Sequence, residues 1–123
     1  MVAIGRGLRS SKDLIMIEKL AKLLKAGIAV TRPVVEAGWY PVSHQVGLTG
    51  KTIRPNLYIA IGISGASQHI VGMQDSRCIV AINKDPEADI FKYCHYGIVG
   101  DLYDVVPEMI RLLEKKRELI PSD

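Results

Sequence analysis

Short apolar runs recur five times along the chain, and each run ends in glycine or polar residues. The runs lie at residues 2–4, 28–30, 57–61, 77–83 and 96–100. A run of this kind between turn-forming residues is typical of a strand that is buried on both faces of a sheet. We therefore expect five strands, with residues 57–61 forming the third.

Apolar residues at helical spacing occupy the segment between the first two runs. They are Leu14, Ile17, Leu20, Ala21 and Leu24. The sequence from Ser10 to Asp13, just before them, has the form of a capping box. Gly27 is expected to end this helix, because glycine readily adopts the left-handed conformation that follows many helices.

Further helical segments are expected at residues 34–37, 68–73, 85–88 and about 104–119. The residues of the last segment that are expected to face inward are Val105, Met109, Leu112 and Leu113. Strands that alternate with helices favour a parallel sheet. We therefore expect an α/β fold of three layers, in which residues 1–123 form one domain around a doubly wound, mostly parallel sheet.

The composition excludes several classes of protein. With 48% hydrophobic residues, 24% charged residues and a formal net charge of +3, the chain is typical of a globular domain. The charge is too small to favour nucleic acid as a partner. No apolar run approaches the ~20 residues of a membrane span. Arg6 and Arg9 interrupt the only apolar start, so no signal peptide is expected.

The two cysteines suggest a reducing environment. Cys78 and Cys94 match no metal-ligand spacing, and we expect both thiols to be free and buried, as is usual in the cytoplasm. The chain also begins directly with a strand-like segment, so we expect it to be part of a longer protein.

The turn after the third apolar run is a candidate anion site. Small residues at positions 62–67 join that run to the helical segment that begins at Gln68. Such a turn leaves backbone N–H groups and the positive end of the helix dipole at the carboxyl edge of a sheet. We predict that this turn binds the pyrophosphate of a dinucleotide, and that His69 and the surrounding loops serve the rest of the cofactor.

Polar residues also follow the other expected strands. They are Arg6, Arg32, Asn83 and Asp101. Ligands of parallel sheets bind at the carboxyl ends of the strands, where these residues are expected. Arg6 is either a phosphate ligand or an exposed loop arginine, and Asp101 either accepts hydrogen bonds from ribose hydroxyls or caps the last helix.

The segment 38–53 has no clear period, and a long loop in a small domain is usually functional. Residues 47–52 read GLTGKT, like the end of a P-loop. However, Gln45 stands where the first glycine is required, and no strand and helix flank the segment. We reject a P-loop NTPase and expect the backbone and the Thr49 hydroxyl to face a planar ring.

Two functions compete with a redox dinucleotide domain. The turn approaches the G-x-S-x-G motif of hydrolases, with Ser64 as the nucleophile and Asp85 or Asp89 followed by His95 as partners. Ala66 replaces the last glycine of that motif, which counts against it. The other alternative is a nucleotide-binding interaction module without redox chemistry, and His69 would then be a histidine on a helix surface.

Several stretches carry a resemblance that covers nearly the whole chain in unbroken order. They are residues 6–8, 45–51, 55–69, 80–88, 101–102 and 105–109. Together they resemble the C-terminal, FAD-binding domain of the electron transfer flavoprotein alpha subunit. The resemblance implies a Rossmann-like domain that binds FAD and belongs to a longer subunit. It implies an electron carrier, which is not a self-contained enzyme.

The resemblance also implies partners. In this family the alpha subunit forms a heterodimer with a beta subunit, which commonly holds AMP. FAD takes electrons from acyl-CoA or related dehydrogenases and passes them on, typically towards a quinone-reducing acceptor at a membrane. The location would be the cytoplasm, or the mitochondrial matrix in a eukaryote.

Finally, the resemblance implies the site residues. Arg6 would bind FAD phosphate or ribose, and Thr31 and Arg32 would lie beside the ring. The residues along the ring would be Val46, Gly47, Leu48 and Thr49, with Leu48 where the family usually has glutamine. The pyrophosphate turn would be Ser64, Gly65, Ala66, Ser67 and Gln68, followed by His69 near the pyrimidine carbonyl. The adenosine half would contact Asn83, Asp101 and Leu102.

A cationic Arg32 and a hydrogen-bond donor at His69 would raise the reduction potential of the flavin.

Overall fold

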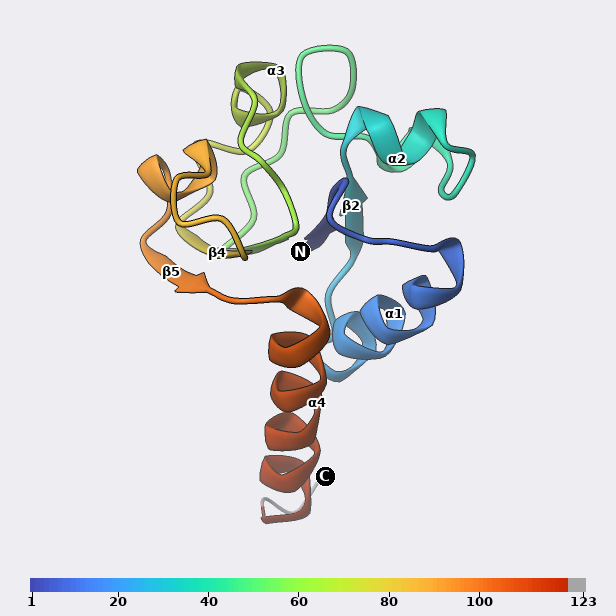
Figure 1. Cartoon of the computed structure of the whole chain (residues 1–123), viewed down its shortest axis with the longest axis vertical. Coiled ribbons are helices and arrows are strands. Elements are labelled where there is room, and N and C mark those ends of the chain that lie inside the picture. The colour runs from blue at the N-terminus through green and yellow to red at the C-terminus, as the bar shows by residue number, and fades with distance from the viewer. Residues whose placement is uncertain (120–123) are drawn as a thin grey trace.

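The computed structural model describes residues 1–119 and contains one parallel sheet (Figure 1). Its strands are β1 (Val2–Ile4), β2 (Ile28–Val30), β3 (Leu57–Ile61), β4 (Cys78–Asn83) and β5 (Tyr96–Val99). Their order in the sheet is β2-β1-β3-β4-β5, and every neighbouring pair is parallel. The five expected strands are confirmed, with β4 beginning and β5 ending one residue inside the predicted range.

Helices of very different lengths connect the strands. They are η1 (Ser11–Asp13), α1 (Leu14–Leu23), α2 (Arg32–Glu36), η2 (Val42–His44), α3 (Ser67–Ile70), η3 (Asp89–Lys92) and α4 (Leu102–Leu119). Only α1 and α4 are long, and they pack against each other on one side of the sheet (Figure 1). The α/β fold with helices around a parallel sheet is therefore confirmed.

The two faces of the sheet have different cores, as expected for three layers. Large side chains such as Ile4, Ile61 and Ile82 point to the face that α1 and α4 cover. The other face presents a row of alanines that lie in register across neighbouring strands: Ala3, Ala29, Ala60 and Ala81. Because alanine is small, irregular segments can approach the sheet closely there. Val46 of the long loop and Ile90 of η3 are buried against this face.

The first helix ends differently from the prediction. Lys25, and not Gly27, adopts the left-handed conformation, with φ of 53°. The N–H of Ala26 donates to the Ala21 carbonyl at 2.8 Å, and the N–H of Lys25 donates to the Lys22 carbonyl at 3.1 Å. This is the pair of hydrogen bonds of a Schellman motif, so a lysine takes the position where glycine is usual.

Three other local predictions need correction. The Ser10 hydroxyl accepts from the N–H of Lys12, but Asp13 accepts from the Tyr103 hydroxyl and does not complete a capping box. Residues 85–88 form a turn, in which Asp85 accepts from two later backbone N–H groups, and the helical segment η3 begins only at Asp89. In α4 the side chain of Leu112 is exposed, and Leu102, Val106 and Ile110 are the buried residues among the side chains that the structure describes.

Two predictions from composition can also be compared with the structure. Cys78 and Cys94 are both free thiols, as expected, but each is half-buried, whereas burial was predicted. None of the helices in the described part of the chain combines the length and the apolar character that crossing a membrane requires.

Candidate cofactor site

Two adjoining clefts lie at the carboxyl edge of the sheet. The first has a volume of about 350 Å³ and the second about 460 Å³. Arg6, after β1, and Ser64, after β3, line both clefts and so mark their junction. A dinucleotide has two halves joined by a diphosphate, and two clefts with a shared cationic junction match that division.

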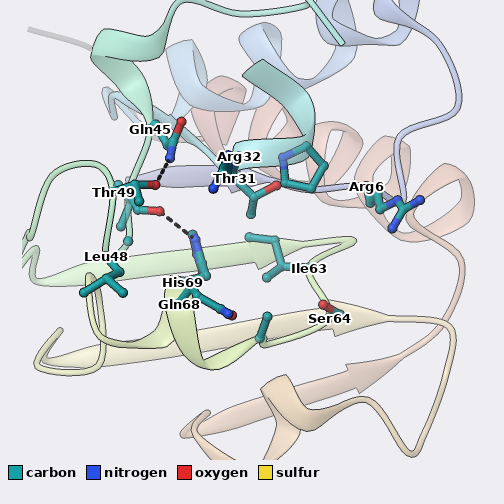
Figure 2. A pocket seen from close by; sticks show the side chains of 14 residues that line it. Arg6, Thr31, Arg32, Gln45, Leu48, Thr49, Ile63, Ser64, Gln68 and His69 are labelled. Carbon is teal, nitrogen blue, oxygen red and sulfur yellow. Dashed lines mark hydrogen bonds between the residues drawn. The ribbon is translucent and has the colours of Figure 1, made fainter. Parts of the chain in front are cut away.

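Most of the predicted site residues line these clefts. In the first cleft they are Arg6, Thr31, Arg32, Val46, Gly47, Leu48, Thr49, Ser64, Ala66, Gln68 and His69 (Figure 2). In the second cleft they are Arg6, Ser64, Asn83, Asp101 and Leu102. The structure therefore brings together residues from six separate segments that sequence reasoning had assigned to one cofactor.

Two predicted residues line neither cleft. Gly65 has a φ of 93°, and a side chain there would collide with the backbone of Ile90 in η3. The Ile90 N–H donates to the Ser64 carbonyl at 2.9 Å, so Gly65 serves the packing of η3 against the turn. Ser67 is exposed at the start of α3 and also lies outside both clefts.

Sequence reasoning also missed some lining residues. Pro33, Gln45 and Ile63 line the first cleft, and Gly7, Arg9 and Lys84 line the second. The sequence places Gln45 in the stretch 45–51 that carries the family resemblance and marks it as the residue that breaks the P-loop pattern, but assigns it no role in the site. Its part in the site depends on the fold of the loop, which buries the Gln45 amide and brings it to Thr49.

The turn between β3 and α3 offers backbone donors to the junction. Within the described chain, the N–H groups of residues 64–68 donate to no other protein group. Gly62, with φ of 62°, brings the turn so close to the first loop that a Cβ there would lie 2.9 Å from the Gly7 Cα. The turn therefore keeps the unpaired N–H groups that suit an anion, as the strand-turn-helix pattern predicted.

Thr31 presents an unpartnered polar atom to the first cleft. It follows β2, and its side chain does not cap α2. Only 9% of Thr31 is exposed, and its Oγ1 atom has no hydrogen-bond partner. Leaving a buried hydroxyl unpaired costs about 1–3 kcal/mol. An orphan hydroxyl in a cleft wall fits a ligand with a polar group at this position.

The two arginines of the first cleft are both exposed. The Arg32 Nε atom donates to Glu36 Oε1 at 2.7 Å, in an ion pair within α2. Arg6 forms no ion pair within residues 1–119. The positive charge at the junction is therefore uncompensated by a neighbouring carboxylate, which favours an anionic ligand.

Asp101 caps the last helix, which was one of its two predicted roles. Its Oδ1 accepts from the N–H of Tyr103 at 2.9 Å, and its Oδ2 accepts from Arg9 Nη2 at 3.1 Å. The Arg9 guanidinium also stacks 4.5 Å from the centre of the Tyr103 ring. Asp101 thus orders this wall of the second cleft, and contact with a ribose stays a prediction.

The loop of residues 45–51 forms an ordered wall of the first cleft. The N–H of Val46 donates to the Val30 carbonyl at 3.0 Å, and the N–H of Leu48 donates to the Gln68 carbonyl at 2.6 Å. The buried amide of Gln45 donates through Nε2 to Thr49 Oγ1 at 2.8 Å (Figure 2). Because this bond uses Thr49 as the acceptor, the Thr49 hydroxyl proton stays available for a ligand.

His69 lies in the wall of the first cleft but is buried, with 6% exposed. Its Nδ1 is 3.1 Å from the Val46 carbonyl, and its Nε2 is 2.7 Å from the Tyr58 hydroxyl (Figure 2 shows the first contact). Burial lowers the pKa of His69 and raises the pKa of Tyr58. The alternative of a surface histidine is therefore wrong. The expected donor role is not met either, because both ring nitrogens already have protein partners.

The arrangement excludes the serine hydrolase alternative. Ser64 follows the carboxyl end of β3, whereas His95 Nδ1 accepts from the N–H of Ile79 near the amino end of β4. Ser64 and His95 therefore lie at opposite edges of the parallel sheet. Asp89 forms an ion pair with Lys92, and the Asp85 carboxylate accepts a hydrogen bond from the N–H of Glu87 within its own turn. No catalytic triad can form from these residues.

A family model and several known proteins match this chain. The family model described as "Electron transfer flavoprotein FAD-binding domain" matches residues 1–74. The LctC subunit of lactate dehydrogenase (NAD(+),ferredoxin) from Acetobacterium woodii is 51% identical over 114 residues, which is 93% of this chain and 27% of that protein. Electron transfer flavoprotein subunit alpha of Thermoanaerobacterium thermosaccharolyticum is 51% identical over 115 residues, which is 94% of this chain and 35% of that protein.

A plant relative has similar identity. The mitochondrial electron transfer flavoprotein subunit alpha of Arabidopsis thaliana is 50% identical over 113 residues, covering 92% of this chain and 31% of that protein. The chain therefore spans between 27% and 35% of the length of these three relatives.

Proposed function

The chain belongs to the family of electron transfer flavoprotein FAD-binding domains, and from this membership we propose that it is the FAD-binding part of an electron-carrying alpha subunit. Its relatives of about 50% identity include proteins named as such subunits. When bound, FAD supplies the reversible uptake and release of electrons. The residues of this chain bind the cofactor, orient it and surround it with charge.

The observation that carries the proposal is the pair of clefts joined at Arg6 and Ser64. We assign the flavin ring to the first cleft, because Val46, Leu48 and Ile63 give it apolar walls. The diphosphate would bind at the junction, to the Arg6 guanidinium and the unpaired N–H groups of the turn. The adenosine half would lie in the second cleft with Asn83, Asp101 and Leu102.

Two polar groups would orient the ring. The orphan hydroxyl of Thr31 would gain a partner from it, and the Thr49 hydroxyl proton is available to donate. Arg32 would stabilise negative charge that develops on the ring, since a guanidinium in a partly dry cleft acts more strongly than in water. His69 would contribute as a neutral, buried group.

We also propose the partners that the family membership implies. The electron transfer flavoprotein beta subunit would form a heterodimer with the complete alpha subunit. Dehydrogenases of the acyl-CoA or related type would deliver electrons, and a quinone-reducing acceptor would take them. The location would be the cytoplasm, or the mitochondrial matrix in a eukaryote. The name of the Arabidopsis relative describes that protein as mitochondrial.

Titration of the purified chain with FAD tests the proposal. We expect one FAD per chain, reducible by dithionite.

Arg6→Ala should weaken FAD binding about 10- to 100-fold, because a charged hydrogen bond at the junction is lost. Arg54→Ala removes an exposed arginine outside both clefts and should bind FAD like the wild type. Absence of FAD binding, or equal affinity of Arg6→Ala and wild type, would contradict the proposal. Binding of ADP but not FAD would favour a nucleotide module without redox chemistry.

A further inference from the structure

Tyr58 is a fully buried tyrosine at the second position of β3, on the face that carries the row of alanines. Its neighbours in this core are alanines and large aliphatic side chains such as Ile79 and Met73. A tyrosine in such a place needs a hydrogen-bond partner for its hydroxyl. The partner is Nε2 of His69, at 2.7 Å, and no cofactor role in the preceding sections uses this contact.

The hydrogen bonds of His69 determine which ring nitrogen carries the proton. The Val46 carbonyl can only accept, so Nδ1 must be the donor in the 3.1 Å contact. A neutral imidazole has a single N–H, so Nε2 must accept from the Tyr58 hydroxyl. Burial favours the neutral forms of both side chains, since it lowers the pKa of His69 and raises that of Tyr58.

The Val46 carbonyl belongs to the wall of the first cleft. The backbone of this wall is anchored to α3 at two points, which are the bond from Leu48 N–H to the Gln68 carbonyl and the bond from His69 Nδ1 to the Val46 carbonyl. We propose that Tyr58 is a positioning residue for the cofactor cleft, because its hydroxyl holds the His69 ring in the orientation in which Nδ1–H donates to the Val46 carbonyl. The inference rests on the proposed function, since it concerns the wall along which FAD would lie.

Removal of the hydroxyl separates this role from packing. Phenylalanine at position 58 fills the same space in the sheet but leaves Nε2 of His69 without a partner. The His69 ring then loses one of its two anchors and can turn about its Cβ–Cγ bond, which weakens the hydrogen bond from Nδ1–H to the Val46 carbonyl. The wall should loosen while the sheet stays folded.

The test compares the full chain with Tyr58→Phe by long-range ¹H–¹⁵N NMR, amide exchange and FAD titration. In the wild type, the His69 nitrogen shifts should show a protonated Nδ1 and an unprotonated Nε2. In Tyr58→Phe, the Nε2 shift should move to the value of a nitrogen that accepts no hydrogen bond, and the amides of residues 46–49 should exchange faster. The FAD dissociation constant should rise about three- to tenfold, as expected for one lost hydrogen bond.

Two controls separate positioning from stability. Tyr96→Phe removes a hydroxyl from an exposed tyrosine of β5 and should match the wild type in every readout. Ile79→Val thins the same core as Tyr58 and should lower the unfolding midpoint without changing the His69 tautomer. Should Tyr58→Phe not fold, His69→Asn is the second variant. Its amide can replace Nδ1 as the donor to the Val46 carbonyl, so the amides of residues 46–49 should exchange at rates close to those of the wild type.

Each of the following outcomes would overturn the proposal or one of the statements on which it rests. A wild-type spectrum with the proton on Nε2 overturns the proposal, as does a Tyr58→Phe variant with unchanged nitrogen shifts and FAD affinity. Changed nitrogen shifts and faster exchange of residues 46–49 with unchanged affinity overturn the link to the cleft. A wild-type chain that binds no FAD overturns the proposed function, and the nitrogen shifts and exchange rates of residues 46–49 then still test whether Tyr58 anchors the wall.

Discussion

The Thr31 hydroxyl is the one side-chain polar atom within residues 1–119 that is buried without a hydrogen-bond partner. Folding removes this hydroxyl from water without giving it a hydrogen-bond partner in the protein. The hydroxyl belongs to a residue in the wall of the cleft in which the sequence predicted a ligand. His69 shows the opposite situation, because both of its ring nitrogens are satisfied inside the protein. At the scale of residues, therefore, the Thr31 hydroxyl has a hydrogen bond left to form, whereas the ring nitrogens of His69 have none.

Thr31→Val should separate ligand binding from stability. Valine has nearly the same shape and removes the unpaired hydroxyl, so the free energy of unfolding should stay equal or rise by up to about 1 kcal/mol. FAD affinity should fall about three- to tenfold, because the ligand loses one partner. Urea unfolding and FAD titration measure the two effects, and Thr52→Val, at an exposed threonine outside the cleft, is the control. Loss of stability with unchanged FAD affinity would show that the hydroxyl serves the fold.

The burial of His69 predicts a dependence of stability on pH. Its folded-state pKa lies below the ordinary value of 6.5, so the unfolded chain takes up a proton at a higher pH than the folded chain. The free energy of unfolding should fall as the pH drops below about 6.5, by up to about 1.4 kcal/mol per pH unit, until the pH reaches the folded pKa.

Urea midpoints at about pH 7.5 and about pH 5.5 measure this linkage. His69→Asn has no titrating group at this position, so its midpoint should change less between the two conditions. An equal change in the variant and the wild type would assign the pH dependence to other residues.

At the scale of elements, the long loop takes the place of a helix on the alanine-rich face of the sheet. The strand boundaries were predictable because a buried strand is a local apolar run between turn residues. The row of alanines was not, since Ala3, Ala29, Ala60 and Ala81 become neighbours only through strand register. Without that row, nothing in the sequence of residues 45–51 indicated that they would pack onto the sheet and form a wall.

The backbone of Gly47, in this loop, packs closely against α3. Its φ is 135°, and a Cβ there would lie 2.5 Å from the Gln68 carbonyl oxygen. Gly47→Ala should therefore displace the loop and lower FAD affinity strongly. Gly38 has a φ of 76° with nothing within 4 Å, so Gly38→Ala should cost about 1–2 kcal/mol of backbone strain and leave FAD affinity unchanged. Unfolding and FAD titrations compare the two variants, and equal affinities would show that the loop does not form the wall.

At the scale of the whole molecule, the site is the carboxyl edge of a parallel sheet, where loops from distant parts of the sequence converge. Most of the site was predictable, because strand ends can be located in the sequence and the family resemblance supplied the loop residues. The roles of Gln45 and Tyr58 were not predictable, since they act through side-chain hydrogen bonds to residues of other segments. The role of Gly65 was not predictable either, because Gly65 packs against Ile90, which comes from the separate segment η3.

Mapping of amide shifts with FAD and its two halves tests the central claim most directly. We predict that FMN shifts the amides of residues 46–49 and of the turn at 64–68, and that ADP shifts those of residues 83–84, 101–102 and the same turn. FAD should shift both sets, with the turn as the common element. Shifts confined to another edge of the sheet, or FMN and ADP that share no affected residue in the turn, would contradict the claim that one dinucleotide bridges the two clefts.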